Sequence, residues 1–300
     1  MSDTQSIPLS VIIPVYNDPE GLETTVESLL DQTVDDYEIL VADNGSTDLT
    51  RKLAKAYATR DRVIHVVEDE IQGSYAARNA GIAAARGEIL CFIDADMWVD
   101  STWLERVQER IRSDEADYLG CNVEIVVDEE TIFAEYNREN GFPVETYIAE
   151  ENFAPTCCLV VRRSVIDAVG PFDKRLVSSG DAEFGKRVHR AGYEQAFAGD
   201  ITMYHPARSS LLSLLQKQSR IGRGQVQRAT YHPEPFALKR HPVHPFNFLP
   251  VPPTVLPELC TDRLLYRCAF MYGISCLEKY ASTLGKTAEW LRQVRAGPGA

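Results

Sequence analysis

The chain has 300 residues, of which 44% are hydrophobic and 25% are charged, and this composition is typical of a soluble globular protein. Its formal net charge of −13 argues against a nucleic-acid partner, and no segment reaches the roughly 18 to 20 consecutive apolar residues of a membrane-spanning helix. The seven cysteines include no C-x-x-C pair and residues 1–8 do not resemble a signal peptide, so we expect a cytoplasmic protein without a disulfide framework.

The first hundred residues alternate strand and helix signals. Strands are predicted at 9–15, 38–42, 63–67 and 88–93, and helices at 21–30, 47–58 and 74–85. This alternation predicts an α/β fold with a doubly wound, mainly parallel sheet flanked by helices. Such sheets bind ligands beyond the carboxyl ends of their strands, and Asp43 and Asp94 both follow such ends.

The remainder of the chain is less regular. We predict a helix at 101–112, a strand at 118–127, an excursion or flexible loop at 128–154, a strand at 157–161, and helices at 164–169 and 181–191. A catalytic domain is expected at 1–231, with a nucleotide-binding half at about 9–100 and an acceptor half at about 101–231. A proline-rich connector at 232–257 and a helical C-terminal extension at 258–300 follow.

Asp94 and Asp96 stand one residue apart, directly after the apolar strand predicted at 88–93. Alternate residues of an extended segment point to the same side, so the two carboxylates are expected to project together. Hard oxygen ligands of this kind suit Mg²⁺ or Mn²⁺ held jointly with substrate phosphates, and such a metal would neutralise a departing diphosphate. The alternative is a solvated acidic turn at the end of the strand.

Three further residues are candidates, each with a structural alternative. Asp43 is suited either to accept a hydrogen bond from a nucleobase or to cap the following helix. Arg78, in an Ala-rich helix, either braces a phosphate or the aspartate pair, or lies at the surface. Asp181, at a helix start, is either a cap or the base that takes a proton from an acceptor hydroxyl.

His205, after the apolar run at 201–204, is either structural or a ligand. A basic cluster follows it, which predicts a diphosphate or phospholipid head-group site or else a solvated helix face. The cluster comprises Lys217, Arg220, Arg223 and Arg228, with Gly222 and Gly224 between them. The chain has no G-x-G-x-x-G after its first strand, no P-loop and no G-x-S-x-G elbow, which argues against dinucleotide oxidoreductases, P-loop kinases and serine hydrolases.

Taken in order, these segments resemble the family 2 glycosyltransferases of the GT-A fold over about residues 10–228. The matching stretches are SVIIPVYN at 10–17, SLLDQT at 28–33, VADNGSTD at 41–48, ARNAG at 77–81, RGEIL at 86–90, the triplet at 94–96, VGPFD at 169–173 and the segment around Asp181. Each stretch is a weak signal alone, whereas the ordered set is specific.

The resemblance implies a role for each matching residue. For the nucleotide, Pro14 and Tyr16 would line the pocket, Asp43 would bind the base, and Asp94 would lie near the ribose. For the diphosphate and metal, Arg78 would lie close to the diphosphate or Asp94, Asp96 would bind Mn²⁺ or Mg²⁺, and His205 would be a further metal or diphosphate contact. For catalysis, Asp181 would be the base, and Glu183 would be the acidic residue two positions later. Two positions depart from the family pattern: Gly180 stands where Glu is common, and Cys157 or Cys158 replaces a common Asn.

The implied reaction is inverting transfer of a sugar from a nucleoside-diphosphate sugar to a hydroxyl group of a glycan or lipid-linked acceptor. A non-catalytic sugar-nucleotide-binding protein of the same fold is one alternative, supported only by Gly180. A nucleotidyltransferase is another, but the chain lacks the glycine-rich, lysine-bearing N-terminal loop of that class.

The C-terminal extension has an apolar face over a helix predicted at 259–295, including Leu264, Leu265, Phe270, Ile274 and Leu277. We expect this face to pack on the catalytic domain or to form a homodimer contact. The alternative is peripheral contact with the inner face of the cell membrane, near a lipid-linked acceptor.

Overall fold

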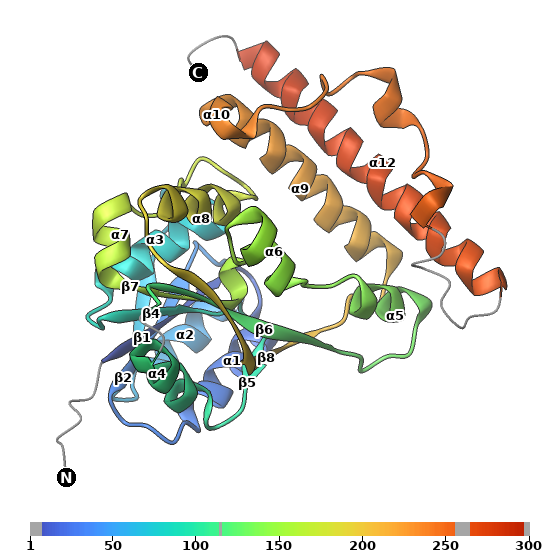
Figure 1. Ribbon diagram of the computed structural model, residues 1–300. Coiled ribbons are helices and arrows are strands. Elements are labelled where there is room, and N and C mark those ends of the chain that lie inside the picture. Colours follow the sequence, from blue (N-terminus) through green and yellow to red (C-terminus); the bar gives the residue numbers. More distant parts are fainter. Residues whose placement is uncertain (1–7, 114–115, 256–264, 297–300) are drawn as a thin grey trace. The chain divides into compact units, whose positions relative to one another are not determined.

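The computed structural model describes residues 8–113, 116–255 and 265–296, and the chain forms two compact units, both drawn in Figure 1. The first unit comprises the described residues up to Val126, Phe142–Lys174 and Gly180–Pro206. The second comprises Val127–Gly141, Arg175–Ser179 and the described residues from Ala207 on. Each unit is therefore assembled from segments that are discontinuous in sequence. The domain boundaries expected at residues 231 and 257 stay predictions.

An eight-stranded sheet forms the centre of the first unit, in the order β3-β2-β1-β4-β7-β6-β8-β5. Its strands are β1 Leu9–Val15, β2 Tyr37–Asp43, β3 Val63–Val67, β4 Ile89–Phe92, β5 Trp98–Val99, β6 Tyr118–Val126, β7 Leu159–Arg162 and β8 Gln195–Pro206. The pairs β1–β2, β1–β4, β2–β3 and β6–β8 are parallel, whereas β4–β7, β6–β7 and β5–β8 are antiparallel. The predicted mainly parallel α/β sheet is confirmed.

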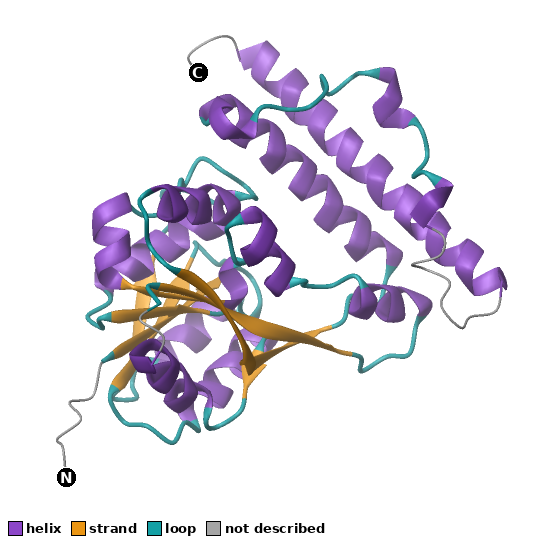
Figure 2. Ribbon diagram, in the orientation of Figure 1, coloured by secondary structure: helices purple, strands orange, loops and turns teal. Residues whose placement is uncertain are grey.

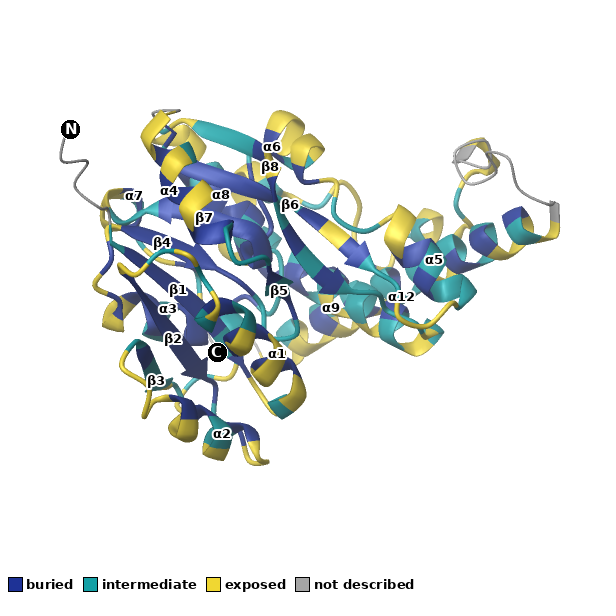
Figure 3. Cartoon of the chain, turned by 90° about the horizontal axis from the view of Figure 1, so that it is seen from below, coloured by how far each residue is buried: buried dark blue, intermediate teal, exposed yellow. Residues whose placement is uncertain are grey.

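Helices cover both faces of this sheet, with α3, α7 and α8 on one side and α1 and α4 on the other (Figures 1 and 2). The helices of the first unit are α1 Pro19–Leu30, α2 Thr50–Tyr57, α3 Ser74–Ala84, α4 Trp103–Ser113, α6 Val144–Glu151, α7 Arg163–Val169 and α8 Gly180–Arg190, with the 3-10 helix η1 at Thr156–Cys158. Every residue of β2 is consequently buried, and Figure 3 shows most of the sheet in the buried colour. A strand covered on both faces needs a continuous apolar run, which is why the predicted strand 9–15 coincides with β1.

The segment 128–154 is not the loop that the sequence predicts. It contains two helices, α5 Ile132–Glu139 in the second unit and α6 in the first. Each has eight residues and buries two or three of them, so no apolar period stands out in the sequence. The hydroxyl group of Thr131 accepts a hydrogen bond from the N–H of Ala134 and thereby caps α5. The prediction of a flexible loop was wrong.

Two long helices, α9 Leu211–Tyr231 and α12 Leu265–Ala296, make up most of the second unit. They pack closely, because a Cβ atom at Gly222 would lie 2.1 Å from the Ser282 carbonyl oxygen and one at Gly285 would lie 2.1 Å from that of Ser219. Both positions therefore need glycine. Helix α5 completes an apolar cluster that contains Tyr136, Leu214, Met271 and Ile274.

The predicted C-terminal helical extension is confirmed as α12, although residues 259–264 of the predicted helix lie outside the described residues. The described part of the connector, residues 232–255, contains the short helices α10 Pro233–Phe236, η2 Pro245–Phe248 and η3 Pro253–Val255. Of the apolar face, Ile274 is buried in the second unit and Phe270 and Leu277 are exposed, while Leu264 and the side chain of Leu265 lie outside the described residues. No helix in the described part of the chain combines the length and apolar character needed to cross a membrane.

A buried carboxylate joins the starts of β1 and β2 to the segment that precedes β4. Glu38 Oε1 accepts hydrogen bonds from the Ser10 hydroxyl at 2.7 Å and the Arg86 N–H at 2.6 Å, and Glu38 Oε2 accepts one from Arg86 Nε at 2.9 Å. Burial alone would raise the pKa of Glu38, but these hydrogen bonds outweigh it and hold the pKa below its usual value of 4.5. The ionised form is therefore the one that stabilises the fold.

We expect Glu38→Gln to lower the free energy of unfolding by about 2 kcal/mol at pH 7, because the amide loses charged hydrogen bonds and turns a donor toward Arg86. A carboxyl with a depressed folded-state pKa stabilises the protein above about pH 4.5 and loses that effect as the pH falls through the folded value. Urea unfolding between pH 7 and 3 should thus show a smaller decline for the variant than for the wild type. Glu88→Gln, at an exposed neighbouring position, is the control, and an equal decline in both variants would contradict the role of Glu38.

Candidate active site at the carboxyl ends of the strands

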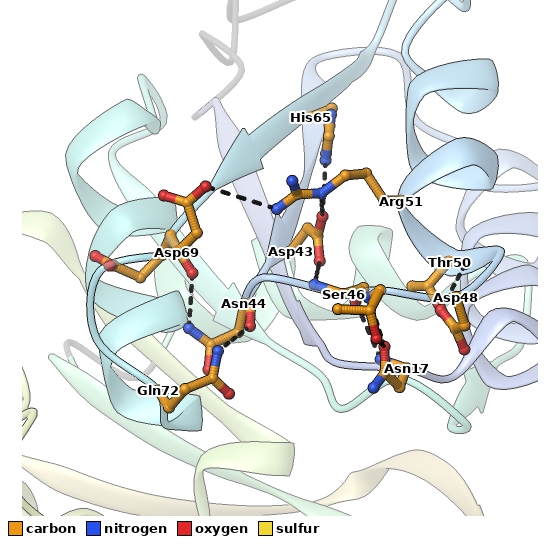
Figure 4. A network of polar contacts seen from close by, with 12 residues as sticks. Asn17, Asp43, Asn44, Ser46, Asp48, Thr50, Arg51, His65, Asp69 and Gln72 are labelled. Carbon is orange, nitrogen blue, oxygen red and sulfur yellow. Dashed lines mark hydrogen bonds and ion pairs between the residues drawn. The ribbon is translucent and has the colours of Figure 1, made fainter.

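The loops that follow β1 and β2 are bound to each other at the carboxyl edge of the sheet (Figure 4). The N–H of Asn17 donates to Ser46 Oγ at 3.0 Å, and Asn17 Oδ1 accepts from the N–H of Thr47 at 2.8 Å. The predicted helix 47–58 begins only at Thr50, because the residues before it form this turn. These hydrogen bonds hold the two loops in one position relative to each other.

Asp43 is fully buried at the end of β2 and serves this turn. Its Oδ1 accepts from the Ser46 N–H and its Oδ2 from Arg51 Nε, both at 2.8 Å. Burial alone would raise the pKa of Asp43, but the bonds from Ser46 and Arg51 outweigh it and lower the pKa below its usual value. His65 Nε2 lies 3.5 Å from Asp43 Oδ2, and burial lowers the pKa of His65, so this imidazole is neutral at pH 7. The predicted helix cap is wrong, because Leu49 is the N-cap residue of α2 and this helix has no side-chain cap; Asp43 instead closes the turn that precedes it.

Asn44 fastens the segment that leads into α3, a role that the sequence pattern does not predict. Its Nδ2 donates to the carbonyl oxygens of Glu68 and Ile71, both at 2.9 Å, and its Oδ1 accepts from the Gly73 N–H at 2.6 Å. Gln72 Nε2 donates to the Asn44 carbonyl oxygen at 2.7 Å (Figure 4). These bonds fix where α3 begins.

The triplet at 94–96 follows β4, and its first carboxylate pairs with Arg78 of α3. Arg78 Nη2 lies 2.5 Å from Asp94 Oδ1. The Arg78 side chain is only 4% exposed, whereas that of Asp94 is 39% exposed. The guanidinium of Arg78 is thus buried and braces the aspartate, which is the first of its two predicted alternatives. The Asp94 carboxylate remains accessible to solvent.

Thr25 of α1, which no sequence motif singles out, holds the backbone of the triplet. Its buried hydroxyl donates to the Met97 carbonyl oxygen at 2.7 Å and accepts from the Asp96 N–H at 3.1 Å. The φ angle of Asp96 is +93°, a region that residues other than glycine seldom adopt. The signal in the sequence for this role of Thr25 is its position as a polar residue among the apolar residues Leu22, Val26 and Leu29 of the same helix.

Helix α3 also contacts the start of α8, where Asp181 lies. The hydroxyl oxygen of Tyr75 accepts from the N–H groups of Gly180 at 2.9 Å and Asp181 at 3.2 Å. One turn farther along α3, Asn79 exchanges two hydrogen bonds with the backbone of Phe172, at 2.8 and 3.1 Å. Tyr75, Arg78 and Asn79 therefore connect the triplet, the loop before α8 and the Asp181 segment.

Glu183, two residues beyond Asp181, is buried and engaged with the protein itself. Arg187 Nε lies 2.7 Å from Glu183 Oε1, and Arg187 Nη2 lies 3.0 Å from Oε2. The same guanidinium donates to the carbonyl oxygens of Val169, Gly170 and Pro171. Glu183 consequently orients an arginine that fastens α8 to the loop after α7.

His205 approaches the triplet through the pairing of β5 with β8. Trp98 lies opposite Tyr204 in this antiparallel pair, so the neighbours Met97 and His205 fall at the same level. His205 is buried, and its Nδ1 lies 2.7 Å from the Pro206 carbonyl oxygen. Because a carbonyl oxygen only accepts, Nδ1 carries the proton of this hydrogen bond.

The donor atoms near the triplet suit a hard divalent cation that is shared with a substrate. Among the described residues, no three His, Cys, Asp or Glu side chains are grouped closely enough to hold a metal by themselves. Mg²⁺ is commonly bound by one or two carboxylates together with substrate phosphates, and the Asp94–Asp96 segment provides such a partial set. The residues present fit a metal bound with a diphosphate.

The other predicted positions are distributed as follows. Tyr16 is 52% exposed after β1, and Pro14 is partly buried within that strand. Cys158 is buried in η1, and burial raises the pKa of its thiol, with smaller contributions from Cys157 and Asp94. The basic cluster lies on α9 of the second unit, where Arg223 pairs with buried Glu289 and Arg228 stacks on Phe236.

Comparison with known proteins adds a family to this geometry. A family model described as glycosyl transferase family 2 matches residues 10–170. The glycosyltransferase AglE of Haloferax volcanii is 42% identical over 229 residues, which represent 75% of this chain and 75% of AglE.

Two solved structures resemble the fold. The mannosyltransferase PcManGT of Pyrobaculum calidifontis, in complex with GDP-Man and Mn²⁺, matches with a TM-score of 0.59 and 15% identity over 98% of this chain and 77% of that one. S. aureus TarS residues 1–349, in complex with UDP-GlcNAc, match with a TM-score of 0.57 and 16% identity over 96% and 93% of the two chains. These likenesses confirm the predicted GT-A type of fold.

We expect Thr25→Val to destabilise the protein by about 1–3 kcal/mol, because the valine leaves the Asp96 N–H and the Met97 carbonyl oxygen without their buried partner. Hydrogen exchange at the Asp96 amide should become faster than in the wild type. Thr24→Val is the matched control, since the exposed Thr24 hydroxyl donates only to the Glu20 carbonyl oxygen. Unchanged protection of Asp96 in Thr25→Val would rule out this role of the hydroxyl.

Proposed function

The chain belongs to glycosyltransferase family 2 and is an enzyme that transfers sugars, and we propose that it moves a sugar from a nucleoside-diphosphate donor to an acceptor hydroxyl with inversion. One observation carries this proposal: a single turn of α3 binds both the Asp94 carboxylate and the start of the helix that bears Asp181. A donor site and a base for the acceptor have to lie close together in a direct displacement, and the shared helix meets that need.

The donor nucleotide is assigned to the loops at the carboxyl ends of β1, β2 and β4. Exposed Tyr16 and partly buried Pro14 line the base and ribose, and Asp94 faces the ribose from its Arg78 support. Asp43 would bind the base only after Arg51, whose side chain is 33% exposed, moves aside. A carboxylate has about four lone-pair positions, so Asp43 can accept from a base while it keeps the bond from Ser46.

Asp96, with His205 beside it, is assigned to a divalent cation. A bound Mn²⁺ or Mg²⁺ would offset the negative charge on the leaving diphosphate. Asp96 supplies a hard oxygen, and its unusual backbone angle is the kind of strain that concentrates at functional sites. His205 presents Nε2, because its other nitrogen is fixed on the Pro206 carbonyl oxygen. PcManGT, a relative in fold, is recorded with GDP-Man and Mn²⁺.

Asp181 is assigned the role of general base. Its carboxylate takes the proton from the acceptor hydroxyl as that oxygen bonds to the anomeric carbon, and the bond from this carbon to the diphosphate oxygen breaks with its electron pair. Attack on the face opposite the leaving group inverts the configuration. The Asp181 Oδ1 atom accepts from the Ala182 N–H at 2.9 Å, which orients the carboxylate at the first turn of α8.

The acceptor is a glycan or a lipid-linked saccharide in this proposal, and homodimer formation or peripheral membrane contact would involve the exposed apolar residues of α12. These include Tyr266, Phe270, Leu277, Leu284 and Leu291. The proposal also keeps residues 1–231 as the catalytic domain of a cytoplasmic enzyme.

Gly180 gives no support to the alternative of a non-catalytic sugar-nucleotide-binding protein. The ring of Tyr75 occupies the space beside it, so a larger residue does not fit at this position.

Asp181→Asn should lower kcat by about 10²- to 10⁴-fold, since the amide cannot take a proton, while the Kd for the donor nucleotide stays nearly constant. Transfer is measured as release of nucleoside diphosphate in the presence of acceptor, and Kd by calorimetry. Asp167→Asn, which changes an exposed carboxylate on α7, is the control. Full transferase activity in Asp181→Asn would remove this residue from the role.

A thermal-shift screen of UDP-, GDP- and dTDP-sugars with and without Mn²⁺ should identify the donor base. A ligand that binds only the folded state at about 100 times its Kd adds about 2.7 kcal/mol of stability. We expect the added shift from Mn²⁺ to disappear in Asp96→Asn and to persist in Asp61→Asn, which changes an exposed loop residue. A metal increment that is equal in both variants would exclude Asp96 as the ligand.

A further inference from the structure

The hydroxyl group of Tyr75 lies at the N-terminus of α8. It is inside the first unit, with Tyr75 4% exposed, and it accepts hydrogen bonds from the N–H groups of both Gly180 and Asp181. The first N–H groups of a helix have no partner within the helix, so they need an acceptor from outside. Here a side chain 105 positions earlier in the chain supplies it.

The ring of Tyr75 also restricts what can stand at position 180. A Cβ atom added to Gly180 would lie 2.7 Å from Cε2 and 2.8 Å from Cζ of this ring, well inside van der Waals contact. Neighbouring rings confine the Tyr75 ring. Its centroid lies 5.7 Å from the ring centroid of Phe172, and the Phe172 centroid lies 4.7 Å from that of Phe184 of α8. Tyr75 and Gly180 are therefore complementary in shape as well as hydrogen-bonded.

The same face of α3 binds the donor side of the site. Arg78 and Asn79 follow Tyr75 at the i+3 and i+4 positions, which lie on one side of a helix. Arg78 pairs with Asp94, and its guanidinium carbon lies 5.5 Å from the centre of the Tyr75 ring. A movement of Tyr75 would consequently change the separation between the Asp94 segment and Asp181.

We propose that Tyr75 is the positioning residue for Asp181: its hydroxyl and ring together set where the carboxylate of α8 stands relative to the donor held at Asp94. The inference rests on the proposed role of Asp181 as the base. Tyr75 is not assigned a contact with substrate. A misplacement of about 1 Å at a reacting group can cost about 10²-fold in rate, so the contribution of such a residue belongs to kcat.

The first test compares Tyr75→Phe with Tyr37→Phe. Both substitutions keep the ring and remove one buried hydroxyl that bonds the backbone, since the Tyr37 hydroxyl donates to the Leu29 carbonyl oxygen at 2.6 Å. We expect similar decreases in Tm. Only Tyr75→Phe should lower kcat by at least about tenfold, with the KM and Kd of the donor changed less than twofold.

The second test is a size exchange between the two complementary positions. Gly180→Ala alone should lower kcat at least about tenfold, because its new Cβ overlaps the ring. In a Tyr75→Leu background, which removes the overlapping ring atoms, the same change should lower kcat less than twofold further. Donor binding, measured by calorimetry, shows that each variant is folded. Such non-additivity is the signature of two residues that act through direct contact.

Two results would overturn the proposal while leaving Asp181 as the base. In the first, Tyr75→Phe and Tyr37→Phe have the same kcat. In the second, Gly180→Ala lowers kcat by the same factor in the wild-type and the Tyr75→Leu backgrounds. The proposed function fails separately, through full activity of Asp181→Asn. The expected kcat losses in both tests, with Asp181→Asn inactive, would support the positioning role.

Discussion

The Arg78 guanidinium is almost fully enclosed, and the carboxylate of Asp94 is the partner that compensates its charge. A buried cation that loses its partner is strongly destabilising, so α3 and the end of β4 are held to one relative position. Tyr75 and Asn79 extend that constraint from the same helix face to α8 and to the loop at Phe172. The Asp94 segment and the start of α8 thus share one rigid support.

That support begins farther back, in the hydrogen bonds around Asn44. The start of α3 is fixed because Asn44 binds three backbone groups of the preceding segment, and Asn44 itself follows β2 in the sheet. Asp43 and Ser46 close the neighbouring turn. Polar residues at the carboxyl edge therefore act in two ways: some hold the loops, and others, such as Asp94, remain partly accessible. A strand-end aspartate is not by itself evidence of a ligand contact.

Sequence patterns predicted the elements that local chemistry determines. Continuous apolar runs predict the full bounds of β1 and β3, and bracing of the aspartate pair is one of the two alternatives that the sequence allows for Arg78. Sequence patterns did not predict the features that depend on interactions between distant segments. The two-residue strand β5 exists through its pairing with β8, and α5 and α6 bury too few residues to show a period. Tyr75 looked like an ordinary helix residue because its partner lies more than a hundred positions away. Gly222 of the basic cluster is explained by backbone packing against Ser282, which no spacing rule reveals.

The interleaved make-up of the two units has a consequence for biosynthesis. Tyr136 of α5 bonds Ser275 and Glu278 of α12, 139 and 142 positions later. At a synthesis rate of about 5–20 residues per second, α5 emerges roughly 7 to 28 seconds before its partner helix. Through that interval the cluster around Tyr136 lacks Met271 and Ile274 of α12, although Leu214 of α9 is synthesised earlier. The apolar cluster of the second unit is therefore completed only when α12 has been synthesised.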